Sequence, residues 1–223
     1  DDVESRGLGD VYKRQVVETL KSDYLTCGPK IPEFEQAFCE YVHAKYSVAV
    51  CNATAALHIA AMALGVKEGD NVICTPMTFA SSANCIRFCG GNVRFVDIDP
   101  ETYLLDINKL KEILSTAPKG TYKGMVLVDF AGYPHNMEEY RKVADEYGMW
   151  ILEDACHAPG AYFIDSTGER VYCGCGKYSD ITVFSFHPVK HITTGEGGMA
   201  CTQNKEYLSL IHISEPTRLD VIS

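Results

Sequence analysis

The sequence has no long hydrophobic run and no excess of positive charge. None of its apolar stretches approaches the roughly 20 residues that a membrane-spanning helix needs. Acidic residues number 30 against 20 basic ones, which gives a net charge of -10. We therefore expect no nucleic-acid partner and no membrane partner. The first residues also lack the apolar core of a signal peptide, in keeping with a cytoplasmic location.

Paired cysteine motifs are missing too, although the chain has 10 cysteines. There is no CxxC pair, and most cysteines lie inside apolar segments, which favours buried, reduced thiols in a cytosolic protein. Cys173 and Cys175 alone cannot supply the four ligands of a zinc site. His187 and His191 are spaced like a metal pair, but Pro188 and the following glycines argue against a helix there. A thiol or metal module stays open as an alternative, and it would predict bound zinc.

The two ends of the chain, residues 1–15 and 210–223, do not share the pattern of the interior. They contain GDVYKRQ and SLIHISEPTR, which resemble translated sequencing-adapter read-through. We therefore expect both ends to be non-native tails and residues 16–209 to be the natural sequence. A divergent or mobile terminus is the alternative.

Strand-like and helix-like segments alternate between these ends. Apolar runs bounded by turn residues predict strands, and segments with a polar start and a glycine after them predict helices. The alternation predicts an α/β fold, with a mainly parallel sheet and helices on both faces. The predicted strands are 47–51, 71–76, 92–99, 124–129, 150–154, 181–186 and 198–201, and the predicted helices are 54–65, 78–89, 107–114 and 137–147.

Ligands of such sheets bind at the carboxyl ends of the strands, where this sequence places polar residues. The small residues 52–54 lie between a strand and a helix, so that free N–H groups and the helix dipole favour a phosphate there. An ordinary helix cap is the alternative. Asp154 ends an apolar strand, where a carboxylate needs a partner such as a protonated pyridoxal ring nitrogen. His157 could reach the same group, and a structural turn is again the alternative.

A later strand contains a serine near its end and is followed by a lysine. Ser185 could donate to a phosphate, and Lys190, beside a glycine-rich turn, could form a Schiff base with a carbonyl compound. A solvated surface lysine is the alternative. Phe79 follows the second strand, where an aromatic ring could stack on a flat cofactor or belong to the core.

The order and spacing of these motifs resemble the DegT/DnrJ/EryC1/StrS family of pyridoxal-phosphate-dependent sugar aminotransferases. This resemblance implies that residues 16–209 form a fold-type I large domain, that a smaller C-terminal domain is missing, and that the enzyme is a homodimer. The motifs that carry it span residues 24–202 and read LTCGPKIPEFEQAF, CNATAALHIAAMALGVKEGD, TPMTFASSANC, FVDID, EDACHAPGA and SDITVFSFHPVKHITTGEGG.

The resemblance also implies a role for each candidate residue. Lys190 would be the catalytic residue, forming the Schiff base with pyridoxal 5′-phosphate and then moving the proton. Asp154 would pair with the ring nitrogen, His157 would lie beside the ring oxygen, and Phe79 would stack on the ring. The groups implied at the phosphate are the Ser185 hydroxyl, the Thr54 side chain, and the backbone of Ala53, Thr54 and Ala55.

Within the family, CNATAALHIA, FASSANC and KYSDITVFSFHPVK resemble the branch of pseudaminic acid biosynthesis. That branch implies amino transfer to C4 of a UDP-linked 4-keto-6-deoxy amino sugar, with glutamate as the donor. An enzyme acting on another nucleotide-linked keto sugar is one alternative, because a fold does not determine a substrate. A non-catalytic relative is another, although the presence of both Lys190 and Asp154 argues against it.

Overall fold

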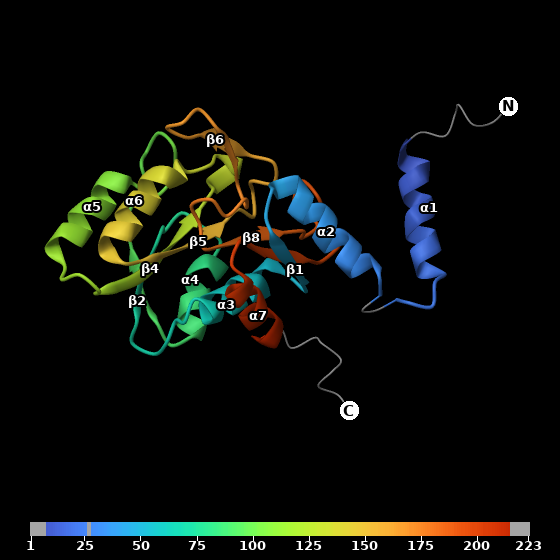
Figure 1. Ribbon diagram of the computed structural model, residues 1–223, viewed down its shortest axis with the longest axis horizontal. Helices are drawn as coiled ribbons and strands as arrows, with labels where there is room; N and C mark the ends of the chain where they lie inside the picture. The colour runs from blue at the N-terminus through green and yellow to red at the C-terminus, as the bar shows by residue number, and fades with distance from the viewer. Residues whose placement is uncertain (1–7, 26–27, 215–223) are drawn as a thin grey trace.

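The computed structural model describes residues 8–25 and 28–214, and its centre is a seven-stranded sheet in the order β1-β9-β8-β5-β4-β2-β3 (Figure 1). The strands β2, β3, β4, β5 and β8 pair in parallel, whereas β9 runs antiparallel to both of its neighbours, β8 and β1. The predicted α/β fold with a mainly parallel sheet is therefore confirmed. The strands are β1 (Tyr46–Val50), β2 (Asn71–Cys74), β3 (Asn92–Phe95), β4 (Tyr122–Val128), β5 (Trp150–Asp154), β8 (Ile181–Ser185) and β9 (Gly198–Thr202).

Helices cover both faces of the sheet. Successive residues of a strand point to opposite faces, and in this sheet the apolar side chains on each face pack against helices. In β4, Val126 belongs to the core beneath one set of helices, and its neighbour Met125 belongs to the core beneath the other set. The first set comprises α3 (Ala53–Ala63), α4 (Ser81–Phe88) and α7 (Lys205–Ser214). The second set comprises α2 (Lys30–Val42), α5 (Ile107–Thr116) and α6 (Met137–Tyr147).

Four further elements of the described residues lie outside these layers. The helix α1 (Leu8–Leu20) stands apart from the sheet in Figure 1. The strands β6 (Tyr162–Ile164) and β7 (Arg170–Tyr172) form an antiparallel pair of their own. A short 3-10 turn, η1 (Phe130–Gly132), follows β4. None of the described helices is long and apolar enough to cross a membrane.

Several predicted elements end differently in the structure, and local side chains explain why. The helix expected over 78–89 begins only at Ser81, after a turn in which the Thr75 hydroxyl accepts the Met77 N–H at 3.3 Å. The strand expected over 92–99 stops at Phe95. Beyond it, the carboxylates of Asp97 and Asp99 accept nearby backbone N–H groups and so hold the chain in turns. The helix α2 and the β6–β7 pair were not among the predicted elements.

The cysteines agree with the expectation of free thiols. The nine described cysteines form no disulfide, and five of them are buried. Cys89, Cys156 and Cys175 are half-buried, and Cys51, which directly follows β1, is exposed. Cys27 falls outside the described residues.

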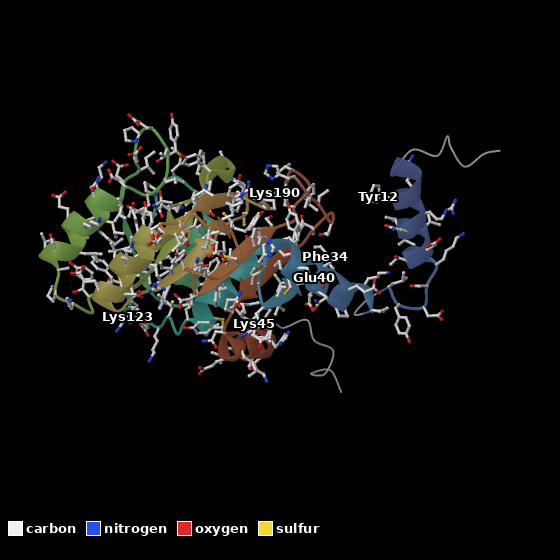
Figure 2. The ribbon with its side chains drawn as sticks, turned by 45° about the horizontal axis from the view of Figure 1, so that its top comes forward. Tyr12, Phe34, Glu40, Lys45, Lys123 and Lys190 are labelled. Carbon is white, nitrogen blue, oxygen red and sulfur yellow. The ribbon has the colours of Figure 1, made fainter. Side chains whose placement is uncertain are left out.

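Strand directions bring several carboxyl ends to one edge of the sheet. The strands β1, β2, β4, β5 and β8 all end at that edge, and β9 begins there. Figure 2 shows Lys190 at this edge, on the opposite side of the molecule from Lys45 and Lys123. Lys45 precedes β1, and Lys123 lies at the start of β4. A ligand site is therefore expected around Lys190.

Candidate active site

A cavity of about 370 Å³ opens at this edge of the sheet. Five chain segments line it: the β1–α3 turn, the start of α4 with the turn before it, and the segments that follow β4, β5 and β8. Six of the seven predicted site residues are among its walls, and these are Thr54, Phe79, Asp154, His157, Ser185 and Lys190.

The seventh residue, Ala55, is not part of the cavity wall, and the helix cap uses its backbone N–H. Asn52 precedes α3 with extended backbone angles, and its side chain accepts the Ala55 N–H at 2.9 Å. The N–H groups of Ala53 and Thr54, both lining the cavity, remain at the open start of the helix. The cap therefore leaves the N–H groups of the first two helical residues available to an anion.

Ser185 adds a hydroxyl to this part of the cavity. The residue ends β8, is buried, and lines the cavity together with Ala53 and Thr54. Its oxygen accepts the His187 N–H at 3.4 Å, so its own hydrogen can be donated to a ligand. Helix dipole, free N–H groups and hydroxyl together suit a phosphate.

Asp154 is buried at the end of β5, and both of its carboxylate oxygens have donors. Oδ2 accepts the Ser82 hydroxyl at 2.5 Å, and Oδ1 accepts the Cys156 N–H at 3.2 Å. A carboxylate has about four lone-pair sites, so acceptor capacity remains on the side that lines the cavity. The arrangement suits a ligand that presents a hydrogen-bond donor with positive charge.

His157 is fixed in one orientation by the turn after β4. The Ala131 N–H donates to its Nδ1 at 3.2 Å, which leaves Nε2 as the nitrogen that carries hydrogen in the neutral ring. Burial lowers the pKa of His157, and the nearby charge of Lys190 lowers it further. The imidazole is therefore neutral at pH near 7 and can donate through Nε2.

Lys190 lies half-buried in the segment between β8 and β9. Its N–H donates to the His187 carbonyl at 2.9 Å. The same segment is tied back to the end of β8, because the Thr193 hydroxyl and the Thr194 N–H both donate to the Phe186 carbonyl. An amine held at the cavity wall by such a loop is positioned to react with a carbonyl group.

Phe79 is at the mouth of the cavity rather than in the core. It lines the cavity with 75% of its surface exposed. The core alternative considered for this residue is therefore wrong. An exposed aromatic ring at a cavity mouth is suited to cover a flat ligand.

A second group of candidate ligand atoms lies away from the cavity. Asp129, Glu153 and Cys173 are buried, with ligand atoms within 4.8 Å of one another. None of the three is among the cavity walls. The group includes Cys173 but not Cys175, so the YCGCG pair does not act as a unit in this arrangement.

Sequence reasoning missed the residues that support Asp154. Ser82 was quoted within a motif but received no role, although the structure places its hydroxyl on the carboxylate. Its position gives a signal that could have identified it. Ser82 lies on the buried side of α4 with Cys85 and Ile86, and a polar residue on such a side needs a partner.

The fold and the walls of this cavity define a class of enzyme. A lysine, a buried carboxylate and an anion-binding helix start at the carboxyl ends of a parallel sheet are the features of a pyridoxal-phosphate site. The model of the DegT/DnrJ/EryC1/StrS aminotransferase family matches residues 8–214, and the chain belongs to this family of pyridoxal-phosphate-dependent sugar aminotransferases.

Individual relatives agree with this assignment. The chain is 40% identical over 199 residues to the UDP-4-amino-4,6-dideoxy-N-acetyl-β-L-altrosamine transaminase of Campylobacter jejuni serotype O:23/36, covering 89% of this chain and 50% of that protein. It is similar to the structure of Helicobacter pylori PseC, an aminotransferase of pseudoaminic acid biosynthesis, with a TM-score of 0.80 and 29% identity over 90% of this chain and 52% of that one.

A third relative was solved with its cofactor. The structure of NtdA from Bacillus subtilis, with bound PMP, matches with a TM-score of 0.79 and 30% identity over 92% of this chain and 44% of that one. The chain spans about half the length of the curated relatives it matches.

Proposed function

We propose that the chain is the cofactor-binding part of an aminotransferase that acts on a nucleotide-linked keto sugar. The observation that carries the proposal is the meeting of Asp154, Lys190 and the start of α3 in one cavity. We also propose that residues 16–209 are the large domain of this enzyme. The free thiols fit a reaction in a cytosolic compartment.

The residues fit pyridoxal 5′-phosphate at both of its ends. Gly198 begins β9 directly beneath the β1–α3 turn, where an added Cβ would lie 2.5 Å from the Asn52 carbonyl carbon. This close packing presents the Ala53 and Thr54 N–H groups for the phosphate, with Ser185 as an additional donor. The Asp154 carboxylate, which also lines the cavity, would hold the protonated ring nitrogen.

When bound, the cofactor supplies an electron sink that stabilises negative charge at the carbon next to the amino group. Lys190 would take the proton from that carbon and return it to the cofactor carbon bonded to the same nitrogen, which is a 1,3-proton shift. Asp154 would keep the ring nitrogen positively charged, and the neutral His157 would donate from Nε2 toward the ring oxygen. Phe79 would cover the ring and exclude water from one side.

We propose that the sugar is a UDP-linked 4-keto-6-deoxy amino sugar, aminated at C4, as in pseudaminic acid biosynthesis. The support is the 40% identity to the altrosamine transaminase and the structural likeness to PseC. We propose glutamate as the amino donor and a homodimer as the working form. A keto sugar linked to another nucleotide is the competing substrate, since identity at this level leaves substrate contacts free to differ.

The test is an amino-transfer assay of the complete enzyme that contains this chain, with pyridoxal 5′-phosphate and glutamate, offering UDP-linked and dTDP-linked 4-keto sugars in parallel. We expect the UDP sugar to be aminated by the wild type and not by Lys190→Ala. The exposed Lys205→Ala serves as the matched control and should keep the wild-type rate. Amination of the dTDP sugar alone would overturn the proposed UDP-linked substrate. Equal rates for wild type and Lys190→Ala would overturn the proposed role of Lys190.

A further inference from the structure

Ser82 is a fully buried hydroxyl placed between two functional parts of the cavity. Its Oγ lies 2.5 Å from Asp154 Oδ2 and 2.6 Å from Thr78 Oγ1. Thr78 and Asp154 both line the cavity, whereas Ser82 lies behind the wall. The three side chains therefore form a continuous chain of hydrogen bonds from one part of the cavity wall to another.

The direction of these hydrogen bonds follows from the number of hydrogens. The Asp154 carboxylate can only accept, and the Ser82 hydroxyl has a single hydrogen to give. Ser82 therefore donates to Asp154, where the charge and the short distance make the bond strong. Its oxygen must then accept from Thr78, so that the donation runs from Thr78 through Ser82 to Asp154.

The second carboxylate oxygen is fixed independently. Asp154 Oδ1 accepts the Cys156 N–H at 3.2 Å. A carboxylate held at both oxygens cannot rotate freely about its last bond, so its remaining acceptor directions are set before any ligand arrives. Ser82 belongs to α4, and Thr78 belongs to the turn before it. Their contact with the end of β5 sets the orientation of the carboxylate from outside the strand.

We propose that Thr78 and Ser82 are positioning residues that aim the Asp154 carboxylate at the ring nitrogen of the cofactor, an inference that rests on the proposed function. Neither residue needs to touch the ring nitrogen for this role. Removing the Ser82 hydroxyl leaves Asp154 with one protein donor. We expect the dissociation constant for pyridoxal 5′-phosphate to rise about tenfold or more, because hydrogen bonds to charged groups are among the strong ones.

The variants are Ser82→Ala and Thr78→Val, with Ser47→Ala as the matched control. Ser47 is also a buried serine, and its hydroxyl donates to the Glu35 carbonyl at 2.7 Å, outside the cavity walls. Cofactor affinity is measured by titration with pyridoxal 5′-phosphate, followed by visible absorption. Ser82→Ala should weaken binding about tenfold, Thr78→Val should weaken it less, and Ser47→Ala should bind like the wild type.

Two further readouts separate positioning from a merely structural role. In the Asp154→Asn background, Ser82→Ala should add little to the loss of affinity, since the group that it orients is already changed. The pH at which the visible absorption band is half titrated should also rise in Ser82→Ala and stay unchanged in Ser47→Ala. The reason is that a poorly aimed carboxylate stabilises less positive charge on the ring nitrogen.

The outcomes distinguish this inference from the proposed function. If the wild type binds the cofactor through Lys190 and Ser82→Ala matches it in affinity and pH midpoint, the positioning role is wrong and the function stands. Additive losses in the double variant would overturn it as well. If the wild type forms no band that depends on Lys190, the function fails, and the inference fails with it. If Ser82→Ala does not fold, Thr78→Val takes its place, because Thr78 is only half-buried. Wild-type cofactor affinity in Thr78→Val would then overturn the positioning role.

Discussion

Gly198 lies against the backbone of Asn52, so that the first residue of β9 supports the turn that opens α3. A Cβ added to Gly198 would come within 2.5 Å of the Asn52 carbonyl carbon and 2.6 Å of the Ala53 nitrogen. Such contacts are with backbone atoms, which cannot move aside as a side chain does. The glycine therefore determines where the free N–H groups at the start of α3 can lie.

We expect Gly198→Ala to lower the free energy of unfolding by about 1–3 kcal/mol, as overpacking of a close-packed site does. The displaced turn should also weaken cofactor binding beyond the effect on stability. Urea unfolding and cofactor titration measure the two effects. In the control Gly197→Ala the nearest atom is Thr194 Oγ1, at the end of a side chain, so its loss should be smaller. Equal losses in both variants would contradict this account of the turn.

Asp154→Asn should separate cofactor affinity from stability. The amide oxygen can still accept the Ser82 hydrogen, and a buried charge is removed, so the unfolding free energy of the cofactor-free protein should stay equal or rise. Affinity for pyridoxal 5′-phosphate should fall by about tenfold or more, because the ionic partner of the ring nitrogen is lost. A variant that binds the cofactor like the wild type would show that Asp154 has only a structural role.

Glu153, the residue before Asp154, should make stability depend on pH. Burial, followed by the charge of Asp129, raises its pKa from 4.5 to about 8. Between these pH values the folded protein keeps a proton that the unfolded chain has lost. The free energy of unfolding should therefore fall as pH rises, by up to about 1.4 kcal/mol per pH unit, and level off above the folded-state pKa.

Glu153→Gln tests this dependence, since an amide does not titrate. Its amide oxygen can still accept from Ser179 and Thr182, which bond the carboxyl group in the wild type. The variant should be more stable than the wild type near pH 8 and similar to it near pH 5, as urea unfolding at both values would show. The exposed Glu112→Gln should keep the wild-type slope, and an unchanged slope in Glu153→Gln would refute the assignment.

Gly124→Ala should affect the core without affecting the site. A Cβ at Gly124 would lie 2.1 Å from the Trp150 ring across the β4–β5 pair. We expect a loss of about 1–3 kcal/mol in unfolding free energy and unchanged cofactor affinity in the folded protein. The smaller side chain of Trp150→Leu should recover part of the loss in a double variant. A change in affinity without a change in stability would contradict this prediction.

Strand and helix periodicity identified most of the sheet. The expected bounds of 137–147 and 150–154 match α6 and β5, because a regular apolar pattern and clear end signals coincide there. The antiparallel course of β9 was not predicted, since it depends on pairing with β1 and β8 from distant parts of the chain. The helix α2 was missed although its Phe38 and Val42 pack against β8 and β9.

The site was predictable where motifs mark strand ends and less so where contacts join distant segments. Asp154 and Ser185 end strands and Lys190 follows one, and the strand-end rule places them in one cavity. Ala55 was assigned to the phosphate, but the Asn52 cap takes its N–H, which is a matter of local geometry rather than residue type. Ser82 meets Asp154 across 72 residues of sequence, and no local pattern names that partner.

The central claim is that Lys190 is the residue that joins pyridoxal 5′-phosphate covalently. The direct measurement is to add the cofactor, reduce with borohydride, digest, and locate the pyridoxyl group by mass spectrometry. The account predicts that the group is found on Lys190, and that the yellow band and the adduct are both lost in Lys190→Ala. Labelling spread evenly over exposed lysines, or the same adduct pattern in Lys190→Ala, would contradict it.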